Sequence, residues 1–192
     1  PTEHALRLLI HAYGGTVPVA GAASMTERLF LFELIQAAQT SSGILVAGAT
    51  ASATISAHGK LLVWGTLRSS DGESLEEALF RSTVPAPVAT PYAARVERVS
   101  VGASHVLALT DRDDVLSFGC GSDGRLGHGN EKDQREPKVI EAVRGLRVVS
   151  IAAGEQHSMI RTIEGTVLSF GSGSDGRLGH GDEKNQYEPK VI

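Results

Sequence analysis

Residues 115–140 read VLSFGCGSDGRLGHGNEKDQREPKVI, and residues 167–192 read VLSFGSGSDGRLGHGDEKNQYEPKVI. The two segments lie 52 residues apart and are identical at 22 of 26 positions. The four differences are Cys120/Ser172, Asn130/Asp182, Asp133/Asn185 and Arg135/Tyr187. A period of about 50 residues indicates stacked supersecondary units that bury apolar surface against one another. Residues that recur in both copies are therefore expected to build the unit rather than to catalyse a reaction.

Three further features recur at the same period. They are a glycine that ends a short apolar strand, an aromatic–glycine pair whose glycine follows 17 residues later, and a proline that leads an outer strand. In chain order these are Gly48, Gly102 and Gly154, then Trp64-Gly65, Phe118-Gly119 and Phe170-Gly171, and then Pro85, Pro137 and Pro189. Tyr13-Gly14 extends the aromatic–glycine series to an earlier unit. We therefore predict the degenerate end of a preceding unit over 1–43, a degenerate repeat over 44–98, and repeats over 99–150 and 151–192.

The strand signals within one unit are short. Residues 148–153 are apolar and rich in β-branched side chains, whereas 157–161 and 167–170 alternate apolar and polar positions, which places one face inward. The segments 111–114 and 162–165 have the composition of tight turns. Four short antiparallel strands in one unit are typical of a propeller blade. The predicted fold is all-β, a partial β-propeller of about three to four four-stranded blades.

The N-terminal region and one internal loop also carry helix signals. Residues 24–27 have the spacing of a capping box, and apolar residues follow at helical spacing, which predicts a short helix over 26–38. The alternative is a strand, because 34–37 align with 139–142 of the later unit. A second short helix is predicted over 73–80.

Composition limits the classes of partner. The 192 residues carry a net charge of −4, which argues against a broad phosphate-binding face, so nucleic acid is not expected as a broad-surface partner. Cys120 is the only cysteine, which excludes an internal disulfide and fits a reducing compartment. We therefore expect an intracellular protein, cytoplasmic or nuclear. No apolar run reaches the roughly 20 residues that span a bilayer, so no membrane partner is expected.

The repeated string G-x-G-S-D-G-R-L-G-H-G, followed by a charged loop and E-P-K-V-I, resembles the regulator-of-chromosome-condensation repeat. The preceding Gly-x-x-His at 102–105 and 154–157 fits the same repeat. The resemblance is close over 95–192 and weaker over 44–94, where Ala51 replaces the histidine and the L-G-H-G segment is absent. It implies a β-propeller, which in full-length members of the family has seven blades and about twice this length.

The repeated motif is expected to be structural. Its glycines allow tight turns and positive φ, Asp-Gly is a favoured turn pair, the leucine pins the loop, and the histidine bonds backbone groups that the loop leaves unpaired. The residues assigned to these roles are Gly119, Asp123, Gly124, Leu126 and His128 in one copy, and Gly171, Asp175, Gly176, Leu178 and His180 in the other.

Several patterns that suggest chemistry are outweighed by their context. Residues 119–124 spell the dinucleotide fingerprint G-x-G-x-x-G, but a glycine-rich segment follows where a helix is required. The repeated histidines lack the spacing of a metal site, and Cys120 is replaced by Ser172 in the second copy. Ser122, Asp123 and His128 form no G-x-S-x-G elbow and occur twice. We therefore predict no enzyme, no cofactor and no metal.

The charged loops before each proline-led strand are the candidate surface for a protein partner. Asp133, Arg135, Asn185 and Tyr187 differ between the copies and form the candidate partner-binding rim, because loops on a rigid scaffold carry recognition. The leading hypothesis is a non-catalytic protein–protein interaction scaffold. The resemblance implies one alternative, a guanine-nucleotide exchange factor for a Ran-type small GTPase. A further alternative is an accessory propeller of a larger enzyme such as a ubiquitin ligase.

An open arc of three to four blades would leave two apolar blade faces in water, and such patches usually mark interfaces. We therefore expect that the native protein continues past both ends of this sequence or that copies pair to complete a ring. Light scattering of the 192-residue chain should show association. A stable soluble monomer would contradict this expectation.

Overall fold

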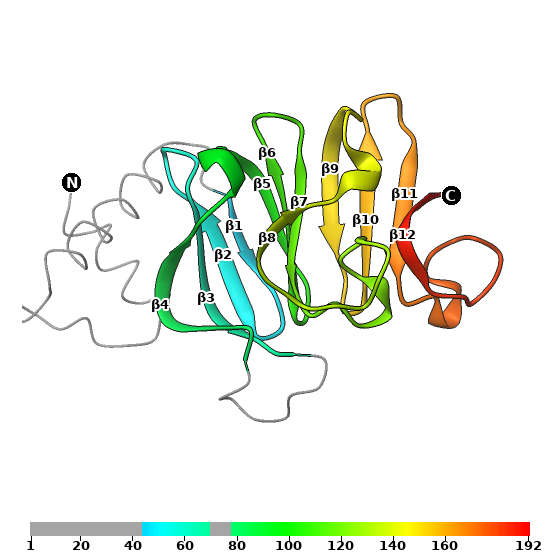
Figure 1. Cartoon of the computed structure of the whole chain (residues 1–192), viewed down its shortest axis with the longest axis horizontal. Helices are drawn as coiled ribbons and strands as arrows, with labels where there is room; N and C mark the ends of the chain where they lie inside the picture. The colour runs from blue at the N-terminus through cyan, green and yellow to red at the C-terminus, as the bar shows by residue number, and fades with distance from the viewer. Residues whose placement is uncertain (1–43, 70–77) are drawn as a thin grey trace, which may run out of the picture. The chain divides into compact units, whose positions relative to one another are not determined.

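Each unit of the repeat folds as a four-stranded antiparallel sheet in which strands follow one another in chain order (Figure 1). The computed structural model describes residues 44–69 and 78–192. The first sheet contains β1 (Leu45–Ala47), β2 (Ala51–Ile55), β3 (Leu61–Leu67) and β4 (Phe80–Val88). The second contains β5 (Val96–Val101), β6 (His105–Thr110), β7 (Val115–Gly119) and β8 (Gln134–Val139). The third contains β9 (Val148–Ala153), β10 (His157–Thr162), β11 (Val167–Gly171) and β12 (Gln186–Val191).

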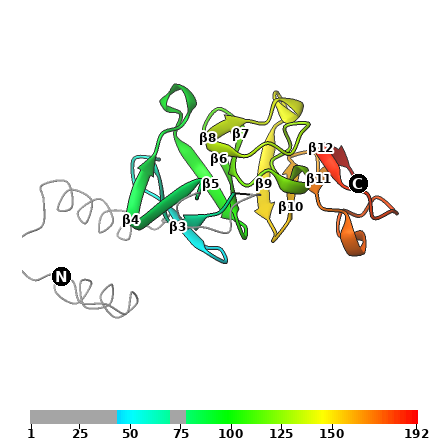
Figure 2. The same cartoon turned by 60° about the horizontal axis from the view of Figure 1, so that its bottom comes forward.

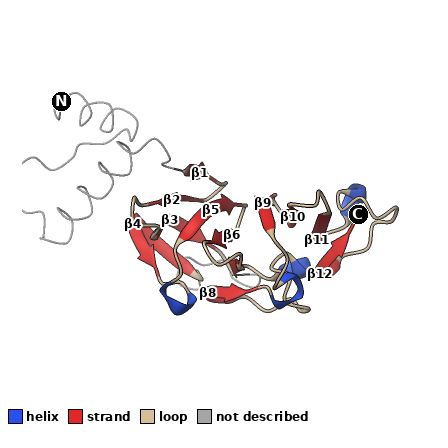
Figure 3. Cartoon of the chain, turned by 90° about the horizontal axis from the view of Figure 1, so that it is seen from above, coloured by secondary structure: helices blue, strands red, loops and turns tan. Residues whose placement is uncertain are grey.

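The three sheets stack as successive propeller blades (Figure 2). Strand β2 packs against β5, and β5 and β6 pack against β9, so the inner strands of neighbouring blades meet. Within the described residues four short 3-10 turns join the strands, namely η2 (Pro91–Ala93), η3 (Ser122–Gly124), η4 (Glu141–Val143) and η5 (Ser174–Gly176), drawn blue in Figure 3. The prediction of an all-β partial propeller is confirmed for the described residues, with three blades.

Several predicted limits need correction. The unit limits at 98/99 and 150/151 fall inside β5 and β9, because the anchor glycine ends the first strand of a blade and the strand itself begins several residues earlier. The helix predicted over 26–38 lies outside the described residues. Of the segment 73–80, residues 73–77 also lie outside them, and Phe80 is the first residue of β4 rather than part of a helix.

The prolines lie within the outer strands instead of starting them. Strand β8 begins three residues before Pro137, and its pairing with β7 shifts register between Ser117 and Gly119. Residues 135–137 bulge opposite Phe118, so the missing N–H of the proline costs no ladder bond. Strand β12 has the same shift in its pairing with β11.

The core lies between the blades, and β6 shows why. All six of its residues are buried, and its four apolar residues alternate between two cores. Val106 and Ala108 join the cluster shared with the first blade, whereas Leu107 and Leu109 join the cluster shared with the third. A strand covered on both faces is the expected result of stacking, because a single sheet cannot cover its own faces.

The anchor glycines allow the inner strands to approach one another closely. A Cβ atom on Gly48 would overlap the carbonyl oxygen of Gly102, and a Cβ on Gly102 would overlap the carbonyl oxygen of Gly154. Every other residue type would force the blades apart at this point. The recurrence of this glycine in the sequence is therefore a consequence of backbone-to-backbone packing between blades.

A buried histidine links the second blade to the third. His105 Nε2 lies 2.9 Å from Ser158 Oγ, and that hydroxyl donates to the Arg125 carbonyl oxygen at 2.8 Å. Because the serine has one proton and the carbonyl can only accept, the imidazole must donate through Nε2. Burial, followed by the charges of Arg125 and His157, lowers the pKa of His105 to about 3, so the ring is neutral at pH 7.

The two sequence copies offer a matched test of inter-blade burial. Ile140 is 0% exposed between the second and third blades, whereas its counterpart Ile192 is 52% exposed. Ile140→Ala should lower the free energy of unfolding by about 2–5 kcal/mol, and Ile192→Ala by well under about 1 kcal/mol. Urea unfolding of the two variants measures both. Equal losses would show that the neighbouring blade does not supply the burial.

Acid is expected to weaken the junction through His105. Between its ordinary pKa of 6.5 and its folded value of about 3, the unfolded chain binds a proton at this histidine and the folded chain does not. The free energy of unfolding should therefore decrease as the pH falls through this window, by up to about 1.4 kcal/mol per pH unit. His105→Gln, which keeps a donor for Ser158, should remove that share of the slope. Urea unfolding of both proteins between pH 7 and pH 5 measures the difference. An equal pH dependence of the free energy of unfolding in the two would show that this assignment is wrong.

Candidate interaction site at the loop rim

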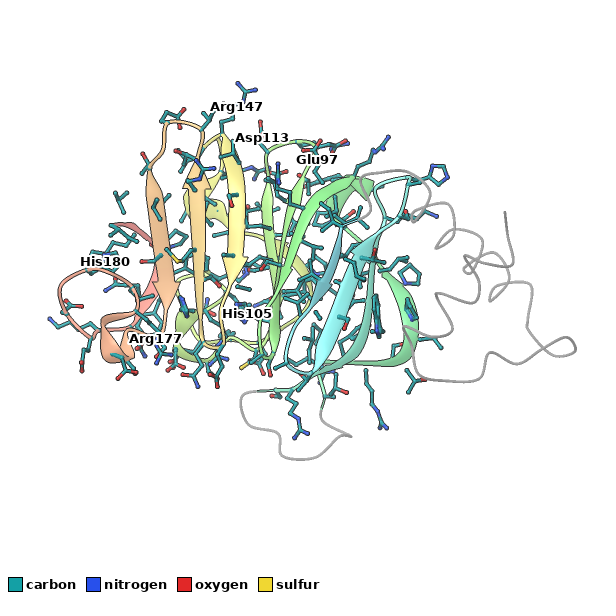
Figure 4. All side chains as sticks on the ribbon, turned by 180° about the vertical axis from the view of Figure 1, so that it is seen from behind. Glu97, His105, Asp113, Arg147, Arg177 and His180 are labelled. Atoms are coloured by element: carbon teal, nitrogen blue, oxygen red, sulfur yellow. The ribbon has the colours of Figure 1, made fainter. Side chains whose placement is uncertain are left out.

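The candidate site lies on the loops that join the third and fourth strands of each blade. We call residues 120–135 and 172–187 the loop rim. Figure 4 shows His105, Arg177 and His180 toward the end of the blades where these loops lie, and Glu97, Asp113 and Arg147 at the opposite end. The rim is therefore separated by the length of the strands from the short turns of the opposite end.

Each rim loop turns sharply at its Ser-Asp-Gly segment. Asp123 and Asp175 have φ angles of 59° and 57°, and the glycine that follows each is also left-handed. Aspartate tolerates this region better than most side chains, and glycine adopts it without strain. The turn η3 is only three residues long and no α-helix follows it, so the G-x-G-x-x-G string lacks the helix N-terminus that a pyrophosphate requires.

A serine and a histidine hold each loop against its own blade. Ser117 Oγ donates to the Leu126 carbonyl oxygen at 2.7 Å and lies 3.0 Å from His128 Nε2. Ser169, Leu178 and His180 repeat this arrangement at 2.6 and 3.0 Å. The leucine is buried in both copies. Burial, followed by the charge of Lys138, lowers the pKa of His128 to about 4, so its ring is a neutral partner at pH 7.

The histidines were predicted to bond backbone groups. The His128 imidazole is hydrogen-bonded to the Ser117 backbone, and through the serine hydroxyl it also reaches the Leu126 carbonyl oxygen. The serine was missed in the sequence because it is embedded in an apolar strand, V-L-S-F-G, where its side chain is fully buried. Its recurrence as Ser117 and Ser169 was the signal that could have identified it.

An arginine closes each loop, but its surroundings differ between the copies. The Arg125 Nε donates to the Ser122 carbonyl oxygen at 2.9 Å, and Nη2 pairs with the Asp123 carboxylate at 3.1 Å. Its Nη1 also reaches the Glu155 carbonyl oxygen on the third blade, and the side chain is 8% exposed. Arg177 repeats the first two contacts and is 27% exposed.

Two of the predicted rim residues bind the chain itself. Asp133 Oδ1 accepts the Gly121 N–H at 2.7 Å, and its Oδ2 accepts the Ser69 hydroxyl at 2.7 Å. Asn185 Oδ1 accepts the Gly173 N–H at 3.0 Å, and its Nδ2 donates to Asp123 Oδ1 at 3.1 Å. In each case one atom holds the residue's own loop and the other contacts the preceding blade.

The other two rim residues present surface to solvent. Arg135 is exposed, and its Nη1 donates to the Ala78 carbonyl oxygen at 3.3 Å. Tyr187 is 42% exposed, and one side of its ring lies against Gly124. Both lie in the bulge of an outer strand. The use of these residues by a partner stays a prediction, and Arg135 and Tyr187 are the members best placed for it.

The rim offers little for a cofactor or a metal. A hollow beside His128, lined also by Lys138 and Glu188, has a volume of about 90 Å³, well below the roughly 300 Å³ of typical small-molecule sites. Over residues 44–69 and 78–192 there is no group of three or more His, Cys, Asp or Glu side chains suited to holding a metal ion. Among the same residues no helix has the length and apolar character to cross a membrane.

The repeat matches models of a known protein family. The regulator of chromosome condensation (RCC1) repeat model matches residues 112–161 and 164–192, and a second RCC1 repeat model matches 96–125 and 148–177. Human E3 ubiquitin-protein ligase HERC2 is 45% identical over 94 residues, which are 49% of this chain and 2% of HERC2. Serine/threonine-protein kinase Nek8 from Danio rerio is 38% identical over 97 residues, which are 50% of this chain and 14% of Nek8.

Solved structures support the same fold. Yeast RCC1 (Prp20) bound to Kap60 matches with a TM-score of 0.66 at 22% identity, over 78% of this chain and 36% of that one. Prp20p from Saccharomyces cerevisiae, whose binding to Gsp1p and histones was studied with its structure, gives 0.64 at 24% identity, again over 78% and 36%. This chain thus spans 2% of HERC2, 14% of Nek8 and 36% of each yeast structure. It belongs to the regulator of chromosome condensation repeat family, and its residues 44–192 form three blades of a β-propeller of that type.

Proposed function

We propose that this chain is a non-catalytic scaffold that binds a protein partner through the loop rim. The observation that carries the proposal is the contrast between the repeated and the varied residues. The residues that could suggest catalysis recur in both copies and serve the fold, such as His128 on Ser117 and Arg125 on Asp123. The exposed Arg135 and Tyr187 differ between the copies, so the rim presents a different surface at each blade.

The relatives favour the view that the shared segment is a binding module rather than a catalytic one. A ubiquitin ligase and a protein kinase have different activities, yet each contains a segment similar to this one in a small fraction of its length. The common part is then the propeller rather than the reaction. Yeast RCC1, which has the same fold, was crystallised with the protein Kap60 and binds Gsp1p and histones. These observations favour a protein as the partner class.

Two narrower versions of the proposal remain distinct. The small share of HERC2 and Nek8 that is matched favours an accessory propeller within a larger enzyme. Exchange-factor activity on a Ran-type small GTPase rests on the fold that this chain shares with Prp20. Release of a fluorescent GDP analogue from a purified Ran-type GTPase separates them, because only an exchange factor accelerates it.

The rim proposal predicts a localised loss of binding. Cross-linking in cells would identify a partner, which is then purified and titrated against the chain by calorimetry. Arg135→Ala combined with Tyr187→Phe should weaken binding at least tenfold, since Tyr and Arg contribute disproportionately to protein interfaces. The phenylalanine keeps the ring against Gly124, so the blade junction should be preserved. Arg112→Ala, an exposed change in the turn after β6 at the opposite end, is the matched control. Equal affinity of the rim variant and the control would refute the proposal.

A further inference from the structure

The Asp133/Asn185 difference between the two sequence copies lies at a blade junction. Both residues use Oδ1 in the same way, accepting the N–H of Gly121 or Gly173. The remaining atom of each side chain faces the preceding blade, where the partners differ. Asp133 faces the Ser69 hydroxyl, and Asn185 faces the carboxylate of Asp123. The change from Asp133 to Asn185 therefore coincides with a change in the group that the side chain contacts on the preceding blade.

The chemistry of each neighbour accounts for the choice of side chain. A hydroxyl donates to a carboxylate, so aspartate at 133 satisfies Ser69. A carboxylate accepts only, so the group that faces Asp123 must donate, and the amide of Asn185 does so at 3.1 Å. An aspartate at 185 would place two carboxylates in contact, with repulsion in place of a hydrogen bond.

The groups around Asp123 do not remove this requirement. Its Oδ2 already pairs with Arg125 Nη2, whose guanidinium is also bonded to Ser122 and to the Glu155 carbonyl oxygen. The backbone N–H of Asp123 lies 3.2 Å from a carboxylate oxygen of Glu131, which adds a second negative charge beside the loop. Oδ1 is thus the atom that is directed at the next blade, and it needs a donor there.

We infer that the residue at position 133 or 185 determines which blade can follow which. An amide is required after a blade whose Ser-Asp-Gly-Arg loop directs its aspartate at the next blade, and a carboxylate is accepted after a blade that presents a hydroxyl there. The side chain acts as a positioning residue for the junction, and the common bond of Oδ1 to the loop glycine is independent of this choice.

Isosteric substitutions test this rule, because Asp and Asn both keep the Oδ1 bond. The reporter is the Gly129 N–H, which donates across the same junction to the Tyr187 carbonyl oxygen at 2.9 Å. In the 192-residue chain, Asn185→Asp should speed hydrogen exchange of the Gly129 amide about tenfold. The matched control Asp133→Asn should leave it unchanged, because that side chain keeps its Oδ1 bond to the Gly121 N–H and faces the first blade rather than the third. The Gly154 amide, bonded within the third blade to the His157 carbonyl oxygen, should be unchanged in both variants.

A double-mutant cycle separates the rule from a general loss of stability. In an Asp123→Asn background an aspartate at 185 regains a donor, so Asn185→Asp should change the Gly129 exchange rate by less than about threefold. Equal acceleration by Asn185→Asp in both backgrounds, or equal effects of Asn185→Asp and Asp133→Asn, would overturn the inference. The cycle also decides the matter if Asn185→Asp alone is poorly folded, since rescue by Asp123→Asn is the expected result.

Discussion

The structure depends on burial of each blade's side chains by the next blade. A four-stranded sheet of this kind has two apolar faces and no helix or second layer of its own to cover them. The central blade shows the consequence, with β6 buried on both sides and its residues divided between two cores. The backbones must come very close for this contact to form, which explains the glycines Gly48 and Gly102 at the ends of the innermost strands. Burial of side chains between blades and close approach of the inner strands therefore depend on each other.

The fold could be read from the sequence because this constraint repeats. The near-duplicate segments revealed the period, and the strands predicted over 157–161 and 167–170 match the bounds of β10 and β11 to within one residue. The predicted alternation holds in β10, whereas β11 is buried at four of its five residues and so has no solvent-facing side. The weaker first repeat still gave a full sheet, since Ala51, Ala53 and Leu61 keep the buried pattern without the histidine. The ends of the strands were harder to predict from the sequence. Pro137 suggested a strand start, whereas the bulge in the outer strand allows the proline inside it, and a bulge leaves no clear pattern in a single sequence.

The rim was harder to predict because its key contacts join different blades. Variation between copies singled out Asp133, Asn185, Arg135 and Tyr187, but it could not separate side chains that hold the chain together from side chains that face solvent. Asp133 and Asn185 hold the loops together, whereas Arg135 and Tyr187 reach solvent. Knowledge of which loop lies beside which side chain was needed, and that information exists only in three dimensions. The buried serines 117 and 169 were hidden for a related reason, since polar residues inside strands are ordinarily read as surface.

The exposed loop of the third blade carries an electrostatic consequence. The Asp175 side chain is 89% exposed, whereas Asp123, in the same sequence context, is 33% exposed beneath the third blade. Any module that stacks on the third blade as that blade stacks on the second will meet this carboxylate at its edge. An acidic group at the meeting point would be repelled before apolar surfaces touch, whereas an amide or ammonium group would be drawn in. Because the carboxylate faces water, dissolved ions screen it, and discrimination between incoming modules should weaken as ionic strength rises.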